Sequence, residues 1–230
     1  MDADINTSKG LIRIKKIEMN KKPYKVLKRM IDIIGALIGF LILVPLTLCI
    51  WVVNFISNDN GPVFYMQDRI GKNGKKFKIW KYRTMCNKAQ EMVKDEKAMK
   101  EHFTEEQIKE WKENFKIEND PRITKVGKFL RKTSLDEFPQ VINILKGELS
   151  IVGPRPVVEE ELEKYANNKE KFLSVTPGLT GYWASNGRSD TSYEERMQME
   201  LYYVDNISFK LDIEIFFKTF ITVLKREGAV

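Results

Sequence analysis

The feature that most constrains the fold is an apolar run, residues 33–53, which carries no charged side chain in 21 positions. As a helix rising about 1.5 Å per residue, the run would be about 30 Å long, close to the thickness of the hydrocarbon core of a bilayer. The run is longer than a signal-peptide core, begins well inside the chain and lacks a small-residue cleavage site, so a secretion signal fits poorly. It therefore predicts a membrane segment.

Two features bear on how this segment meets the membrane. Pro45 interrupts the run, and an internal proline removes a helix hydrogen bond and kinks the helix. Both flanks are also basic, since residues 13–29 hold eight Lys or Arg against one Glu, and residues 57–83 hold seven against two Asp. Because Lys and Arg favour the cytoplasmic side, two cytoplasmic ends favour a re-entrant helix–break–helix. A single spanning helix and a buried helix of a soluble protein stay open as alternatives.

The remaining composition narrows the classes of function. Charged residues make up 31% of the chain and the net charge is +7, which suits nucleic acid, phosphorylated small molecules or an anionic lipid surface. With one histidine and two cysteines, a disulfide framework and a Cys/His zinc site are excluded. Neither G-x-x-x-x-G-K-[ST] nor G-x-G-x-x-G occurs, so the common nucleotide-binding loops are absent.

Local patterns outside the apolar run predict short elements. Residues 63–85 are typical of a β-hairpin that turns at Asn73-Gly74. Residues 87–118 are polar and predict two helices that meet at a capping box formed by Thr104 and Gln107. Basic and aromatic residues are interleaved in the hairpin, but packing on helices or on a membrane surface explains them better than nucleic-acid binding.

The second half of the chain predicts a helix over residues 157–172, a loop over 173–190 and two helices after Thr191. The last of these is amphipathic, with Ile213, Phe216, Phe217, Phe220 and Val223 at helical spacing, as expected for core or for a membrane-surface contact. The fold class is therefore α+β: a membrane helix joined to a helical domain that carries a β-hairpin and amphipathic interfacial helices. The expected divisions are a flexible basic N-terminus (1–23), a re-entrant helix broken near Pro45 (24–56) and a cytoplasmic catalytic domain (57–230).

Two adjacent carboxylates, Asp136 and Glu137, stand in S-L-D-E-F-P-Q. One interpretation is a capping box from Ser134 to Glu137 that starts a helix ending at Gly147. The other is catalytic: adjacent helical residues point about 100° apart, so the two acids can divide labour, one as nucleophile and the other as metal ligand or base.

Basic residues near the acid pair favour phosphoryl chemistry, which needs charge neutralisation by Mg²⁺ and arginine. Arg131 lies about one helical turn before Asp136, and Arg155 is held between Pro154 and Pro156 in a stiff loop. From the residues alone, both interpretations of the pair stay open.

The motifs together resemble the bacterial sugar transferases, also called monotopic phosphoglycosyl transferases. The matching stretches begin with KRMIDIIGALIGFLILVPLTL and GPVFYMQDRIGKNGKKFKIWKYRTM, and continue with SLDEFPQ, VGPRP and PGLTGYWASNGRSD. The resemblance runs from about residue 24 to the C-terminus. S-L-D-E-x-P-Q combined with V-G-P-R-P carries most of its specificity.

The resemblance implies transfer of a sugar-1-phosphate from a UDP-sugar to undecaprenyl phosphate, with release of UMP, as the first membrane step of a surface glycan pathway such as exopolysaccharide or capsule synthesis. It implies that Asp136 is the nucleophile, that Asp136 and Glu137 lie at a required Mg²⁺, and that Arg155, Arg131 and Arg188 bind phosphate or nucleotide. It also implies a re-entrant helix broken near Pro45 and a monotopic location on the cytoplasmic face of the bacterial inner membrane. No nucleic-acid partner is expected; membrane lipids are, and a homodimer is compatible with the family.

The chain departs from the family pattern at Trp183-Ala184-Ser185-Asn186-Gly187-Arg188, where many relatives read W-Q-V-x-G-R, so a role for the missing glutamine is in doubt. It also lacks the several N-terminal transmembrane helices of larger relatives, so the resemblance implies the minimal catalytic form. A rival hypothesis from another class is a membrane-anchored basic module that binds anionic lipid or nucleic acid and needs no Asp136. The sequence does not identify the sugar.

Overall fold

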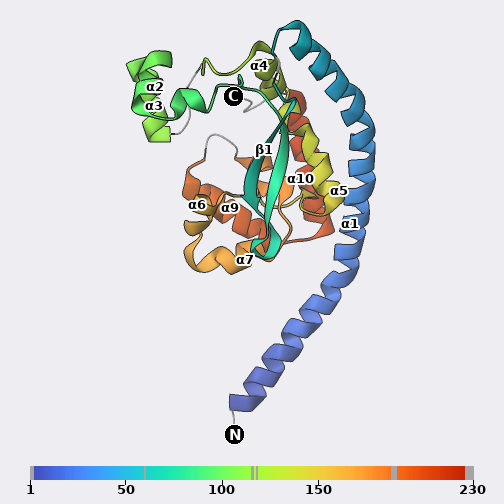
Figure 1. Cartoon of the computed structure of the whole chain (residues 1–230). Coiled ribbons are helices and arrows are strands. Elements are labelled where there is room, and N and C mark those ends of the chain that lie inside the picture. Colours follow the sequence, from blue (N-terminus) through green and yellow to red (C-terminus); the bar gives the residue numbers. More distant parts are fainter. Residues whose placement is uncertain (1–2, 60, 115–116, 118, 188–190, 226–230) are drawn as a thin grey trace.

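The computed structural model describes residues 3–59, 61–114, 117, 119–187 and 191–225, and within these ranges it is α+β. Helix α1 (Ala3–Ile56) runs along one side of a folded domain that contains two small sheets and the remaining helices (Figure 1). The helix is continuous through Pro45, so the break expected there does not interrupt it. Its last turns curve over the domain instead (Figure 1), as an internal proline favours.

One face of α1 packs against the domain along the apolar run. Ala36, Leu43 and Ile50 are buried and lie seven residues apart, so they form one line down the helix every two turns. Polar contacts accompany them: Asp32 accepts hydrogen bonds from the Ser150 hydroxyl (3.0 Å) and the Ile151 amide (2.9 Å), and the Thr47 and Tyr82 hydroxyls lie 2.7 Å apart.

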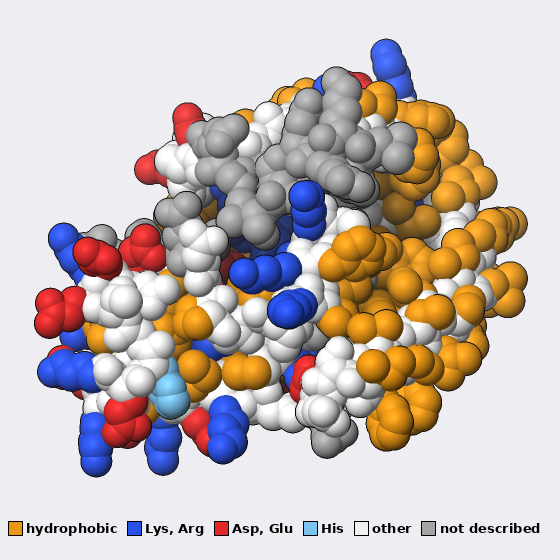
Figure 2. Space-filling view, turned by 90° about the horizontal axis from the view of Figure 1, so that it is seen from above, with side chains coloured by type: hydrophobic (Ala, Val, Ile, Leu, Met, Phe, Trp, Pro, Cys, Tyr) orange, Lys and Arg blue, Asp and Glu red, His pale blue; other side chains and the backbone are white. Residues whose placement is uncertain are grey.

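The opposite face of α1 is apolar and exposed. Figure 2 shows hydrophobic side chains gathered on the side of the molecule where α1 lies, and charged side chains gathered on the other side. Within the described residues, Pro23–Ile56 is the one stretch long and apolar enough to cross a membrane by length and composition, and only 22% of its most apolar window is buried.

Two basic residues fix the first part of this stretch to the domain. Lys28 forms an ion pair with Asp212 at 2.7 Å. The Arg29 guanidinium donates to the carbonyls of Ile144 (2.6 Å) and Leu145 (2.9 Å), at the end of α5 (Val141–Lys146). Terminal helix carbonyls lack partners within their own helix, so Arg29 caps α5 from a distant part of the chain.

The predicted hairpin is confirmed. Strands β1 (Phe64–Ile70) and β2 (Lys76–Tyr82) pair antiparallel with Phe64 opposite Tyr82. The turn includes the 3₁₀ segment Lys72–Gly74, in which Asn73 (φ 56°) and Gly74 (φ 76°) adopt the left-handed conformation that an Asn-Gly turn provides. The inner face of β2 packs Phe77 and Ile79 against Ala36 and Ile144.

A second sheet was missed by the sequence analysis. Strands β3 (Ser150–Val152) and β4 (Gly178–Thr180) pair in parallel, and β4 and helix α8 (Tyr182–Asn186) lie in the predicted loop 173–190. The single helix predicted over 157–172 is also wrong: α6 (Glu159–Glu163) and α7 (Lys169–Leu173) are separate, joined through a 3₁₀ turn at Ala166–Asn168.

The two helices predicted after Thr191 are confirmed as α9 (Tyr193–Asp205) and α10 (Phe209–Lys225). α10 buries Ile215 and Asp212 and packs on α8 and on both strands of the second sheet. Its predicted apolar face is exposed rather than core, since Ile213, Phe216, Phe217 and Phe220 are each more than 40% exposed. Of the two options left open for this helix, a surface contact therefore fits better.

The described residues between 87 and 117 form an arm with its own small core. Helices α2 (Glu96–His102) and α3 (Glu105–Asn114) enclose Met99, Phe103 and Ile108, and the reciprocal bonds of the predicted Thr104–Gln107 capping box are present at 3.1 and 3.3 Å. The arm is the charged region at the left of Figure 2. The prediction that residues 1–23 are loosely held stays a prediction.

Candidate active site

The acid pair lies on a short turn between two helices. Helix α4 (Lys125–Lys132) ends before Ser134, whose positive φ of 56° turns the chain sharply into the 3₁₀ helix η3 (Leu135–Gln140), and α5 follows directly. The Ser134 side chain makes no capping hydrogen bond, so the capping-box interpretation of Ser134 and Glu137 is wrong. Gly147 ends α5 in the left-handed conformation (φ 81°), as predicted.

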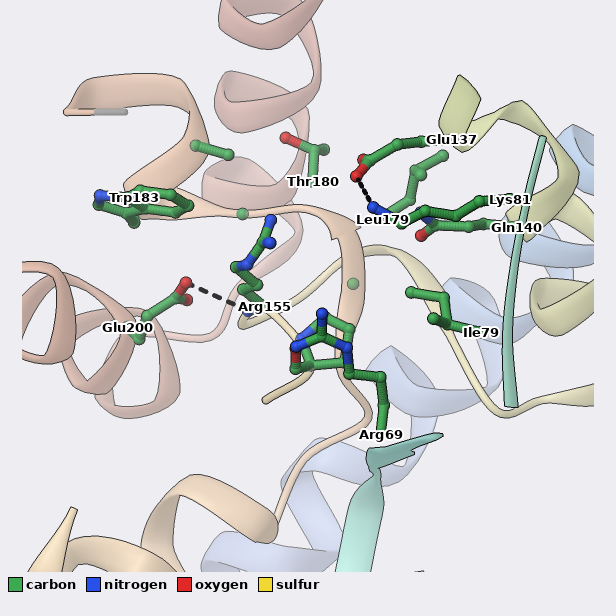
Figure 3. Close-up of a pocket in the computed structure, with 14 residues that line it drawn as sticks. Arg69, Ile79, Lys81, Glu137, Gln140, Arg155, Leu179, Thr180, Trp183 and Glu200 are labelled. Atoms are coloured by element: carbon green, nitrogen blue, oxygen red, sulfur yellow. Dashed lines mark hydrogen bonds and ion pairs between the residues drawn. The ribbon is translucent and has the colours of Figure 1, made fainter. Parts of the chain in front are cut away.

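Glu137 is engaged by a residue of the hairpin instead. Lys81 Nζ on β2 lies 2.6 Å from Glu137 Oε1, in a partly buried ion pair (Figure 3). The α5 residue Asn143 holds the same strand, because its side chain accepts from the Trp80 amide (3.0 Å) and donates to the Lys78 carbonyl (2.8 Å). The strand that supplies Lys81 and the turn that supplies the acids are thus fixed to each other.

The two neighbouring acids differ in proton affinity. Burial raises the pKa of Asp136, and the adjacent Glu137 carboxylate raises it further. Burial alone would also raise the pKa of Glu137, but the positive charges of Lys81 and Arg155 outweigh it and hold that pKa below its usual range. Glu137 is therefore the more firmly ionised member, and Asp136 is the one without a salt-bridge partner among the described residues.

Arg155 approaches from the second sheet. The Gly153–Pro156 loop follows β3, and its backbone pairs closely with β4: Gly153 N–H donates to Thr180 O and Gly178 N–H donates to Pro154 O, both at 2.8 Å. The Arg155 amide donates to Glu200 Oε1 at 3.1 Å. Its guanidinium lies 5.8 Å from the Trp183 ring centre, and Nε has no hydrogen-bond partner among the described residues.

Arg69 of β1 brings a second guanidinium to the same pocket (Figure 3). Burial lowers the pKa of Arg69, and the positive charge of Arg155 lowers it further. Two mutually repelling half-buried cations, each with a buried Nε that has no hydrogen-bond partner among the described residues, form a site that an anion would stabilise. Glu137 and Lys81 line one side of this pocket, and Trp183 and Glu200 line the opposite side.

The sequence of this chain matches, over residues 23–226, the family described as bacterial sugar transferase. The chain belongs to this family. The resemblance proposed from the motifs is thereby confirmed.

The chain is also similar in sequence to individual relatives with related names. The chain is 42% identical over 221 residues to the undecaprenyl-phosphate galactose phosphotransferase of Salmonella typhimurium, covering 95% of this chain and 44% of that protein. It is 44% identical over 204 residues to the exopolysaccharide production protein ExoY of Rhizobium meliloti, covering 88% and 87%. It is 37% identical over 203 residues to the UDP-glucose:undecaprenyl-phosphate glucose-1-phosphate transferase of Escherichia coli, covering 85% and 39%. The chain spans less than half the length of the first and third of these relatives.

The predicted site residues of this sugar transferase are only partly brought together. Arg155 and Glu137 line one pocket, and Asp136 is adjacent to Glu137. Arg131 donates from Nε to the Thr84 hydroxyl at 3.1 Å, and its positive charge opposes part of the rise in the pKa of Asp136. Arg131 therefore lies near the acid but does not line the pocket. Arg188 lies outside the described residues.

Several pocket residues were not singled out from the sequence. Arg69 and Lys81 were counted only among the basic residues of the flank 57–83, and Glu200 lies in a predicted helix to which no site residue was assigned. Strand alternation offered a partial signal, because Arg69 and Lys81 occupy inward positions near the hydrophobic residues of the hairpin. For Glu200 no local signal exists, since its role depends on Arg155, which lies 45 residues away.

The acid pair fits a hard divalent cation. Mg²⁺ prefers oxygen ligands and is commonly held by one or two carboxylates together with water and substrate phosphates. Asp136 and Glu137 supply two such carboxylates side by side, and the neighbouring arginines would hold phosphate. Within the described ranges no group of three or more His, Cys, Asp or Glu is placed to enclose a metal alone, so the remaining ligands would come from water and substrate.

Proposed function

We propose that this sugar transferase moves a sugar-1-phosphate from a UDP-sugar to undecaprenyl phosphate and releases UMP. The observation that carries the proposal is that Glu137 lines one pocket with Arg69 and Arg155, with Asp136 next to it in the chain, which puts the acid pair beside a site that favours an anion. The names of the relatives support the lipid carrier and the nucleotide-sugar. The finer chemistry below is our proposal for this chain.

In the first half-reaction an Asp136 carboxylate oxygen attacks the phosphorus that bears the sugar. The bond from that phosphorus to the bridging oxygen of the diphosphate breaks, and UMP leaves with the electron pair. In the second half-reaction a phosphate oxygen of the lipid attacks the same phosphorus, the bond to Asp136 breaks, and the carboxylate is regenerated. An anionic nucleophile attacking an anionic phosphate needs neighbouring cations, which Lys81, Arg155 and Arg69 supply.

Mg²⁺ belongs to this proposal, with Asp136 and Glu137 holding it and the metal supplying charge neutralisation of the diphosphate. Glu137 is suited to that task because Lys81 and Arg155 keep it ionised. Lys81 also fixes the orientation of the Glu137 carboxylate through their 2.6 Å contact.

We also propose monotopic attachment, in which α1 enters and leaves the bilayer on the cytoplasmic side and bends near Pro45. The domain contacts α1 from Lys28 to Ile50, including the polar contacts of Asp32 and Thr47. A helix that crossed the bilayer with these contacts intact would draw the polar surface of the domain into hydrocarbon, at a large cost in free energy. A helix resting in one leaflet with its apolar face outward avoids that cost.

The reaction is tested with membrane-reconstituted protein, undecaprenyl phosphate and a panel of UDP-sugars. We expect UMP release with at least one donor, dependent on the lipid phosphate for multiple turnovers, together with a lipid diphosphate sugar identified by mass. Removing divalent metal with EDTA should abolish turnover, and Mg²⁺ should restore it. Absence of UMP with every glucose, galactose, N-acetylated and deoxy-amino donor tried would contradict the proposal.

Attachment is tested by labelling single cysteines, Lys25→Cys or Ser57→Cys, in a Cys49→Ser, Cys86→Ser background. Both positions flank the apolar run and are exposed. We expect a membrane-impermeant maleimide to label both in vesicles that expose the cytoplasmic face and neither in vesicles of the opposite orientation. Lys97→Cys on the exposed arm marks the side of the domain. If Lys25→Cys reacts from the side opposite to Lys97→Cys, the helix spans the bilayer.

A further inference from the structure

Glu200 is buried in the wall of the pocket without a full set of partners. Its side chain is 1% exposed, yet it lines the pocket together with Arg155 and Trp183 (Figure 3). Oε1 accepts the Arg155 amide at 3.1 Å, whereas Oε2 has no hydrogen-bond partner among the described residues. Burying an acceptor without a partner costs free energy, so a native protein that keeps one has a use for it.

The neighbours of Oε2 do not satisfy it. Arg155 and Arg196 are close enough for their charges to act on Glu200, but neither guanidinium forms an ion pair with it among the described residues. The Tyr165 hydroxyl, whose pKa is raised by burial and by the Glu200 charge, is likewise without a hydrogen bond.

The chemistry of the free oxygen selects the ligand group. Burial raises the pKa of Glu200 to about 7, so a substantial part of it is ionised at neutral pH. The ionised carboxylate repels phosphate and gains nothing from an apolar lipid tail, but it accepts strongly from a hydroxyl. In a nucleotide-sugar, the hydroxyls of both the ribose and the hexose lie a few bonds from the diphosphate. Glu200 and Arg155 line one pocket and Glu200 Oε1 accepts the Arg155 amide, so a donor whose phosphate met Arg155 would bring its hydroxyls to the wall of the pocket that contains Glu200.

We propose that Glu200 is a donor-binding residue whose Oε2 accepts a hydrogen bond from a ribose or hexose hydroxyl of the nucleotide-sugar, while Oε1 holds the Arg155 loop. This inference rests on the proposed function and deepens it. It assigns to α9, which lies outside the acid and arginine motifs, a part in selecting the donor.

Glu200→Gln separates the two tasks of the side chain. The glutamine oxygen still accepts the Arg155 amide, but its NH₂ replaces the Oε2 acceptor with a donor. We expect kcat/KM for the preferred UDP-sugar to fall roughly 10- to 100-fold, the range for loss of a hydrogen bond to a charged group. Glu194→Gln, an exposed acid on the same helix, is the matched control and should match wild type.

Donor analogues identify the hydroxyl. We test the 2′-deoxyuridine counterpart of the preferred donor and counterparts that each lack one hexose hydroxyl. With the wild-type protein, we expect one of these analogues to have a kcat/KM that is lower by a similar factor. With Glu200→Gln, kcat/KM for that analogue should fall little further, because the missing hydroxyl and its acceptor on Glu200 form one interaction. A ribose analogue and a hexose analogue distinguish the two sources of the hydroxyl.

Two results would count against the inference. A Glu200→Gln variant equal to wild type, with Glu200→Ala impaired, would mean that Glu200 only holds the Arg155 loop. Equal penalties for every analogue in wild type and Glu200→Gln would mean that no hydroxyl meets Oε2. Both results are distinct from failure of the proposed function. In that case the wild-type protein itself releases no UMP from any donor, and the proposal of a donor site is wrong as well.

Discussion

Asp136→Asn should lower UMP release by about 10³-fold or more, because an amide cannot form the acyl phosphate on which the proposed mechanism depends. Asparagine has nearly the shape of aspartate, and Asp136 has no salt-bridge partner to lose among the described residues, so the fold should survive the change. The measurement is the initial rate of UMP release from the donor and undecaprenyl phosphate. Asp68→Asn, an exposed acid on β1, is the control and should retain activity.

The covalent step has its own readout. Wild type mixed with donor and no lipid should gain the mass of a hexose phosphate at the peptide containing Asp136, and Asp136→Asn should not. Donor binding, measured by titration, should persist in the variant because the arginine pair is untouched. Substantial turnover by Asp136→Asn would exclude this residue as the nucleophile, and intact lipid binding with no UMP from wild type would favour a binding module.

Gly178→Ala is expected to be among the most damaging changes of a single methyl group. Its Cβ would lie 2.1 Å from Gly153 N and 2.4 Å from Thr180 O, both backbone atoms that cannot rotate away. The β3–β4 pair must therefore separate, and with it the loop that holds Arg155. Overpacking of this kind costs roughly 3 kcal/mol, which corresponds to a melting temperature lower by about 10 °C in a chain of this size.

The activity of Gly178→Ala should fall with its stability, because Arg155 loses its position against Trp183 and Glu200. Gly74→Ala is the matched control: its Cβ would meet nothing within 4 Å, and only its positive φ of 76° is unfavourable, so the change should cost about 1 kcal/mol and spare turnover. Thermal unfolding and UMP release measured on the same preparations check both. A Gly178→Ala protein as stable as the Gly74→Ala protein would show that β3 and β4 can separate at little cost in free energy.

Elements with local signals were predicted well from the sequence. The Asn73-Gly74 turn, the Thr104–Gln107 capping box and the Gly147 helix end each depend on residues a few positions apart, and each is present. The second sheet has no such signal. Its strands are three residues each and exist because Gly153 and Gly178 allow backbones to meet, which only the tertiary structure reveals.

The residues of the candidate site also divide into those with a local sequence signal and those without one. The acid pair and Arg155 could be found because they stand in short motifs with an identifiable chemistry. Ser134 was misassigned, because a serine three residues before a glutamate resembles a cap, but its left-handed backbone removes it from that role. Lys81 and Arg69 come from a hairpin that contributes three pocket residues, and Glu200 comes from a helix that contributes one, so their chemistry appears only where the elements converge.

The capping of α5 by Arg29 ties the apolar helix to the acid pair. Arg29 belongs to α1, and α5 continues directly from the turn that carries Asp136. Under the proposed function and attachment, the nucleophile is therefore set at a constant depth relative to the surrounding leaflet. The proposed polyprenyl acceptor would arrive by two-dimensional diffusion with its head group already at that level, and the protein would not need to lift it out of the bilayer.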